Sequence, residues 1–248
     1  MIGNDLDLRN KLFLIVPQKT FSCILSGEKV AINEENLHHI RRVLRQKGDI
    51  ELNISSGDGK IFPAKLNSSD KIEKLSDQPF VFSRTKKISL MTSGIQKKNL
   101  EYLIQKSTEL GIDSFYFIRS DYDNFPVQNP ERYRKMAISA CIQSKNPVIP
   151  EFEIFSLKLA DILYNKDTLY LWGDPGQSSF INTVNLADIS AFSEICFING
   201  PEGGWSPKEV DFLKNRFRSI CLSNNVLRAE TAAIAAIFYL KLLTKGSG

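Results

Sequence analysis

The pattern of apolar positions divides the chain into two parts with different periodicities. Up to about residue 83, short apolar runs alternate with turn signals such as the Gly57-Asp58-Gly59 segment, which is typical of short strands joined by tight turns. One short helix is expected over 34–45, with Asn33 as its N-cap. The pattern predicts a small, mainly antiparallel barrel with strands at 11–16, 21–25, 49–55, 60–66 and 79–83.

From residue 84 onward, apolar strands alternate with amphipathic helices. In the first helix, Leu100, Leu103 and Ile104 fall on one face, and Gly111 follows as a C-cap. Ser206 has the features of an N-cap, with a proline next and a glutamate three residues later. Alternating strands and helices imply a parallel sheet covered on both faces. The expected strands are 88–94, 114–119, 168–173, 194–200 and 219–223, and the expected helices are 97–110, 131–144, 178–189, 207–217 and 229–243.

Composition places the chain among ordinary globular proteins. Of its 248 residues, 42% are hydrophobic and 24% are charged, so it can bury a substantial core. It contains no run of about eighteen apolar residues, the length that spans a bilayer. Acids precede the first short apolar run, which is untypical of a signal peptide, and the four cysteines are widely separated. These features favour a cytoplasmic protein with no membrane association and with reduced thiols.

The net charge of +4 is small, but basic residues gather in one segment. Within 38–47 there is no acid, and a stripe of that kind can neutralise phosphates. The alternative is a solvated helix face. The candidate RNA-binding residues of this stripe are Arg41, Arg42, Arg45 and Lys47.

Three loops in the second part are candidates for a ligand site, because open parallel sheets bind ligands beyond the carboxyl ends of their strands. They are 172–176, 199–205 and 223–228. In the second loop, three glycines among residues 200–204 allow the backbone to approach a ligand closely, and Pro201 stiffens the turn. Taken alone, this loop could equally be an ordinary turn from strand to helix.

Several chemistries can be excluded. The glycine-rich loop lacks the GK[ST] ending of a phosphate-binding P-loop, and GxGxxG is absent. The only histidines, His38 and His39, lie in the first part, so the second part has neither a Ser/His/Asp triad nor a histidine metal site, and no metal is expected. The remaining pattern fits a reaction that needs little acid–base help. Methyl transfer is such a reaction, because the sulfonium cofactor carries its own leaving group.

Several separate motifs, spread over nearly the whole chain, resemble the RsmE family of 16S ribosomal RNA uridine-N3 methyltransferases, members of the SPOUT superfamily. They correspond to the family's H-x-x-x-V-L-R…G-D, K-A-T-E-L-G, Q-S…I-P, G-P-E-G-G-F-S and I-L-R-x-E-T-A segments. In this chain the matching residues are 39–49, 105–111, 143–150, 200–206 and 226–232.

The resemblance implies an α/β fold: a PUA-like β-barrel over residues 1–83 for RNA, and a SPOUT domain over 84–248 with a parallel sheet and a deep trefoil knot. It further implies a homodimer that uses S-adenosylmethionine, without a metal, to methylate N3 of a uridine in 16S rRNA of the small ribosomal subunit. The alternatives are another RNA position and a non-catalytic RNA-binding or assembly protein. The implied cofactor residues are Leu171, Trp172, Ile198, Gly200, Pro201, Glu202, Gly203, Gly204, Leu222, Asn224, Val226, Leu227, Arg228 and Thr231.

Two arginines are the candidate catalytic residues. Arg228 could orient the cofactor or stabilise the uracil anion, and Arg119 could hold the target base or an RNA phosphate, or could form a salt bridge. Glu230 opens a helix, which favours a structural role, and no general base is evident. The chain departs from the family at 121–125, where acidic and aromatic residues replace a basic stretch, and at 139–146. These departures affect the expected RNA face more than the cofactor site.

Overall fold

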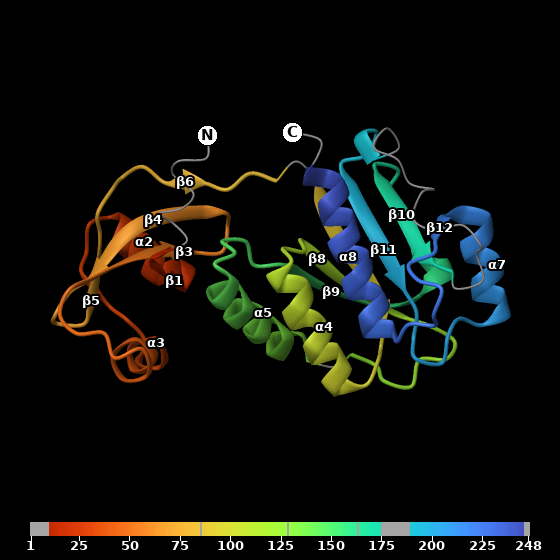
Figure 1. The fold of residues 1–248 in the computed structure, drawn as a ribbon, viewed down its shortest axis with the longest axis horizontal. Helices are drawn as coiled ribbons and strands as arrows, with labels where there is room; N and C mark the ends of the chain where they lie inside the picture. The colour runs from red at the N-terminus through yellow and green to blue at the C-terminus, as the bar shows by residue number, and fades with distance from the viewer. Residues whose placement is uncertain (1–9, 85, 128, 163, 175–188, 246–248) are drawn as a thin grey trace. The chain divides into compact units, whose positions relative to one another are not determined.

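The computed structural model describes residues 10–84, 86–127, 129–162, 164–174 and 189–245 (Figure 1). The chain divides into two compact units, one formed by 1–83 with 141–149 and the other by 84–140 with 150–248. The expected helix at 178–189, except for its last residue, and the end of the loop at 172–176 lie outside the described residues.

The first unit is a small mixed sheet with helices. The strands have the order β1-β3-β4-β5-β2, and β6 pairs with β4. Only the β1–β3 pair is parallel among these pairings, so the sheet is mainly antiparallel as predicted. The elements are β1 (Leu12–Ile15), α2 (Gln18–Leu25), β2 (Val30–Ala31), α3 (Glu34–His38), the π-helical turn η1 (His39–Val43), β3 (Ile50–Ser55), β4 (Lys60–Leu66), β5 (Lys71–Lys74) and β6 (Phe80–Val81).

One expected strand of this unit is wrong, because residues 21–25 belong to helix α2. Phe21 and Ile24, three residues apart, are both buried in the core, which is the spacing of one helix face. The expected cap at Asn33 is confirmed, since its side chain accepts a hydrogen bond from the backbone N–H of Asn36 at 2.8 Å. The helix that follows is interrupted: a π-helical turn begins at His39.

Residues 141–149 complete this unit through backbone hydrogen bonds. The N–H of Gly59 donates to the carbonyl of Pro147 at 2.9 Å, and the N–H of Ile149 donates to the carbonyl of Gly57 at 3.0 Å. The core beneath the sheet includes Leu52 and Ile54, both fully buried.

The second unit is a parallel sheet of six strands, as the alternating pattern predicts. The strand order is β12-β10-β11-β7-β8-β9, and every pairing is parallel. Its elements are β7 (Lys87–Ser93), α4 (Lys97–Glu109), β8 (Ser114–Arg119), α5 (Pro130–Ser144), β9 (Glu151–Lys158), the 3-10 turn η2 (Leu159–Asp161), β10 (Thr168–Gly173), β11 (Glu194–Asn199), α7 (Pro207–Arg216), β12 (Arg218–Ile220) and α8 (Ala229–Lys245). Strand β9, at the edge of the sheet, was not expected from the sequence.

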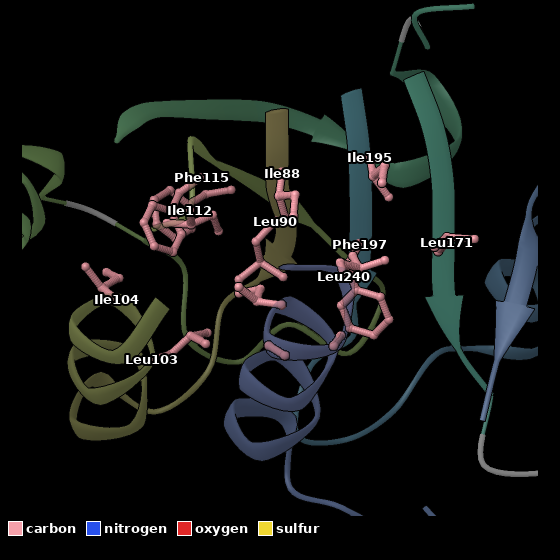
Figure 2. Close-up of a cluster of buried hydrophobic side chains, with 14 of the residues drawn as sticks. Ile88, Leu90, Leu103, Ile104, Ile112, Phe115, Leu171, Ile195, Phe197 and Leu240 are labelled. Carbon is pink, nitrogen blue, oxygen red and sulfur yellow. The ribbon is translucent and has the colours of Figure 1, made fainter. Parts of the chain in front are cut away.

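Alternate residues of the central strands point to opposite faces of the sheet and pack into two separate hydrophobic cores. On one face, Ile88, Leu90 and Phe197 pack with helices α4 and α8, as Figure 2 shows. On the other face, Met91 and Ile198 pack with α7 and η2. Both faces of the sheet are therefore covered, which leaves its strand ends available for a ligand.

Two expected helix caps in this unit are confirmed. Gly111 follows α4 with φ +83, the left-handed conformation that favours glycine at a C-cap. Ser206 and Glu209 form a reciprocal capping box at the start of α7. Across the described residues, every helix falls short of the length or apolar character that a membrane span requires.

Candidate functional site

A cavity of about 580 Å³ lies where the carboxyl ends of β10, β11 and β12 meet. The strand register brings these ends together, because Trp172 pairs with Ile198 and Gly173 pairs with Ile220. The walls come from the loops that follow the three strands and from the start of α8. This is the position at which open parallel sheets bind ligands.

Most of the residues predicted for the cofactor line this cavity. They are Ile198, Gly200, Pro201, Glu202, Gly204, Leu222, Val226, Leu227 and Arg228. Five predicted residues are not among those that line it in the described chain. Leu171 and Trp172 are buried in the two cores, and Gly203, Asn224 and Thr231 are exposed.

Two glycines give the 200–204 loop its shape. A Cβ on Gly200 would lie 2.9 Å from Cε2 of Trp205, so the indole ring packs directly over the Gly200 backbone. Gly204 has φ +76, and its N–H donates to the carbonyl of Pro201 at 3.0 Å, which closes the turn. By contrast, a Cβ on Gly203 would meet its nearest neighbour, Tyr122 Cβ, at an ordinary 3.5 Å.

Glu202 ties this loop to the start of helix α4. Its Oε1 accepts hydrogen bonds from the backbone N–H of Gln96 at 3.1 Å and from Nδ2 of Asn99 at 3.0 Å. A carboxylate there is stabilised by the N-terminal end of the helix dipole. Gln96 and Asn99 themselves line the cavity. No sequence motif marks Gln96 and Asn99. They could have been found only from the order of strands in the sheet, which places β7 and the helix that follows it beside β11.

The base of the cavity is held by a buried polar contact between two strand ends. Asn199, at the end of β11, donates from Nδ2 to Oγ1 of Thr92 on β7 at 3.2 Å. Both side chains are buried, and Asn199 lines the cavity. This hydrogen bond fixes the point at which the chain enters the glycine loop.

The start of α8 and the residue before it place two opposite charges at the cavity. Arg228 is exposed, and its carbonyl accepts the N–H of Ala232 at 2.9 Å as the helix begins. Glu230 is 8% exposed and also lines the cavity. Its Oε2 is buried without a hydrogen-bond partner in the described part of the chain.

Arg119 lies outside the cavity lining, at the end of β8. Its side chain is half-exposed, with Nε 3.8 Å from Oδ2 of the buried Asp123. The neighbouring Asp121 accepts hydrogen bonds from Nζ of Lys158 and from Oγ of Ser206, each at 2.7 Å. These partners, chiefly Lys158, lower the pKa of Asp121 below its usual value. Asp121 is therefore engaged within the fold, whereas Oδ2 of Asp123 has the ion pair with Arg119 but no hydrogen-bond donor among the described residues.

The basic stripe of the first unit is not uniform. Arg41 is half-buried, and its guanidinium donates to Oδ1 of Asp70 and to the carbonyls of Asn67 and Gly48 at 2.8–2.9 Å. The rest of the stripe, Arg42, Arg45 and Lys47, is exposed. Over the described ranges there is no group of three or more His, Cys, Asp or Glu side chains placed to hold a metal ion.

Comparison with known families identifies the family to which the chain belongs. The RNA methyltransferase domain family matches residues 83–241, and the RNA methyltransferase PUA domain family matches residues 32–75. The chain belongs to this RNA methyltransferase family. The resemblance to the RsmE family that its motifs suggested is confirmed, and the parallel α/β architecture with a PUA-like first unit is that of the family.

Individual relatives cover most of the methyltransferase chain. It is 28% identical over 219 residues to the ribosomal RNA small subunit methyltransferase E of Rickettsia conorii, covering 85% of this chain and 88% of that one. With the protein of the same name from Bacillus subtilis it shares 29% identity over 245 residues, covering 87% and 92%. The fold matches a crystal structure of a ribosomal RNA small subunit methyltransferase E from Neisseria gonorrhoeae bound to S-adenosyl methionine, with a TM-score of 0.76, 23% identity and 94% and 98% coverage.

Proposed function

We propose that this chain transfers the methyl group of S-adenosylmethionine to N3 of a uridine in 16S rRNA of the small ribosomal subunit. The observation that carries the proposal is the cavity at the carboxyl ends of β10, β11 and β12, which lies inside the matched RNA methyltransferase domain. The names of the relatives support ribosomal RNA as the substrate. The cofactor bound to the structural neighbour supports S-adenosylmethionine.

The residues present fit this cofactor. A cavity of about 580 Å³ is within the range of roughly 300–1,000 Å³ that binds small molecules of this kind. Ile198, Leu222 and Leu227 offer apolar contact for a flat ring, and the glycine loop offers backbone donors and acceptors. When bound, the cofactor supplies an electrophilic methyl group and its own leaving group.

Arg228 is assigned the main catalytic role. It lines the cavity, and it is the only cationic side chain among the described residues that do so. Uracil becomes anionic as N3 loses its proton, so a positive charge beside the base stabilises the transition state more than the neutral ground state. Arg119, outside the lining, is assigned to an RNA phosphate at the rim of the sheet rather than to the chemical step.

In this proposal one part of the chain binds RNA and the other transfers the methyl group. Residues 1–83 form the RNA-binding domain, with Arg42, Arg45 and Lys47 contacting phosphates and Arg41 holding their backbone in place. Residues 84–248 form the methyltransferase domain. By family resemblance this domain carries a deep trefoil knot, and the enzyme works as a homodimer in the cytoplasm.

Two experiments test the proposal: a calorimetric titration with S-adenosylmethionine and an assay of methyl transfer to 16S rRNA. We expect calorimetry to detect one S-adenosylmethionine site per chain without added metal, and we expect tritium from the labelled methyl group to enter 16S rRNA in small subunits that lack the modification. Binding without transfer would favour a non-catalytic RNA-binding protein. No binding would refute the assignment of the cavity. Light scattering tests the homodimer.

A further inference from the structure

Glu230 differs from the other buried carboxylate that opens a helix in this unit. Glu209 and Glu230 each lie in the first turn of a long helix, and each is 8% exposed. Both oxygens of Glu209 are satisfied: Oε1 accepts from the N–H of Asp121 at 3.0 Å, and Oε2 accepts from the N–H of Ser206 at 2.8 Å. Oε2 of Glu230 has no partner in the described chain, and the residue lines the cavity.

An unpartnered buried carboxylate oxygen is unfavourable for the folded protein alone. Leaving such an acceptor without a donor costs free energy, and the dipole of α8 offsets only part of that cost. The oxygen is therefore placed for a donor that arrives with a ligand. The ammonium, adenine amine and ribose hydroxyls of S-adenosylmethionine can donate hydrogen bonds, and so can the imide N3–H of uracil. Of these donors, only the imide has to lose its proton for the methyl group to be transferred to N3.

We infer that Glu230 is the general base of the reaction, accepting the N3 proton of the target uracil on Oε2. The inference rests on the proposed function and deepens it. The N3–H bond breaks and an O–H bond forms on Oε2, while the N3 electron pair forms the bond to the methyl carbon. The electron pair of the broken carbon–sulfur bond stays on sulfur, and the proton on Glu230 later passes to water.

The charges around the cavity suit this role. The other charged side chains in its described lining are Asp174, Glu202 and Arg228. Glu202 is engaged by the start of α4. Arg228, two residues before Glu230, supplies positive charge for the uracil oxygens while the proton leaves from N3. The residue before α8 and the second residue of α8 thus both line the cavity, the first as a cation and the second as a proton acceptor.

The test compares Glu230→Gln with Glu209→Gln, a matched change at a buried helix start. Glutamine keeps the shape of Glu230 but cannot accept the proton. We expect Glu230→Gln to lower the single-turnover rate on small subunits by about 100-fold or more. Its S-adenosylmethionine affinity should stay within about threefold of wild type, and its Tm should be unchanged or higher because a buried charge without a partner is removed. Glu209→Gln should lower Tm, because its amide group would face a backbone N–H.

The pH profile adds a readout that a structural role would not change. Around neutrality the wild-type rate should be independent of pH, because Glu230 takes the N3 proton. The rate of Glu230→Gln should instead rise with pH in proportion to hydroxide concentration, because the N3 proton must then be lost to solvent. Loss of S-adenosylmethionine affinity alone would make Glu230 a cofactor ligand and overturn the inference. A fall in Tm like that of Glu209→Gln, with an unchanged rate, would overturn it as well. A wild-type enzyme that methylates another position would refute the N3 function, whereas an active wild type with an equally active Glu230→Gln would refute only the role of Glu230.

Discussion

Gly200 and Trp205 make the tightest packing in the glycine loop. A Cβ on Gly200 would lie 2.9 Å from Cε2 of the indole, which in turn lines the cavity. Gly200→Ala must therefore displace Trp205 or the loop, and overpacking of this kind costs about 1–3 kcal/mol. We expect the affinity for S-adenosylmethionine, measured by calorimetry, to fall by about tenfold or more.

Gly203→Ala is the matched control for that change. Its Cβ would meet Tyr122 at an ordinary 3.5 Å, and Gly203 is not among the glycines with a positive φ. We expect this variant to bind the cofactor as wild type does. Equal loss of affinity in both variants would mean that the whole loop, rather than the Gly200–Trp205 contact, responds to substitution.

Arg228→Ala tests whether Arg228 acts in the methyl-transfer step or in ligand binding. If Arg228 stabilises the uracil anion, turnover should fall by about 100-fold while RNA affinity stays nearly intact, because the interaction strengthens only in the transition state. Arg228→Lys should recover part of the rate, since it keeps the charge but not the planar geometry. A loss confined to cofactor affinity would instead make Arg228 a binding residue.

At the scale of the element, the 121–125 segment is joined to helix α7 through Asp121 and Ser206. Because the pKa of Asp121 is lowered in the folded state, chiefly by Lys158, its stabilisation is full above the unfolded value of 3.8 and is lost as pH falls through the folded pKa. Denaturant unfolding of wild type and Asp121→Asn should differ near neutral pH and converge in acid. A difference that persists at pH 2 would show that the carboxylate charge is not responsible.

The basic stripe combines a structural arginine with exposed cations. Arg41→Ala removes hydrogen bonds to Asp70 and to two carbonyls, so it should destabilise the first unit by about 1–3 kcal/mol. Changing Arg42, Arg45 and Lys47 together to alanine should leave stability within about 0.5 kcal/mol of wild type.

RNA binding distinguishes these two variants further. The triple variant should reduce the slope of log affinity against log salt by about 0.7–0.9 for each phosphate that is no longer neutralised. Filter binding at several salt concentrations measures this slope. An unaltered slope would show that the stripe is a solvated helix face.

Elements with strong periodicity were predictable, and the misses have physical reasons. Strand β9 was not predicted because charged residues, Glu151, Glu153 and Lys158, interrupt its apolar residues. It is also an edge strand, which leaves Ile154 and Leu157 partly exposed. Residues 21–25 read as a strand because a short apolar run fits either structure. Pro17 just before the helix and the three-residue spacing of the buried Phe21 and Ile24 are the signals of the helix.

At the scale of the whole molecule, the glycine loop and the start of α8 were predictable because each is a compact motif. Gln96 and Asn99 were not, because they reach the cavity only through the order of strands in the sheet. The free oxygen of Glu230 could not be predicted either, since a missing partner is visible only when all neighbours are placed. Sequence motifs therefore identified the loops that line the cavity. The remaining lining residues, such as Gln96 and Asn99, became known only from the fold.

Transfer of a methyl group to uridine N3 is the central claim, and nucleoside mass spectrometry tests it most directly. Small subunits from a strain that lacks this enzyme would be incubated with the purified protein and S-adenosylmethionine, and their 16S rRNA would then be digested to nucleosides. The account predicts one equivalent of 3-methyluridine per subunit, with none formed by Arg228→Ala over the same short interval. Methylation at another base or at a ribose, or no new methylated nucleoside at all, would contradict it.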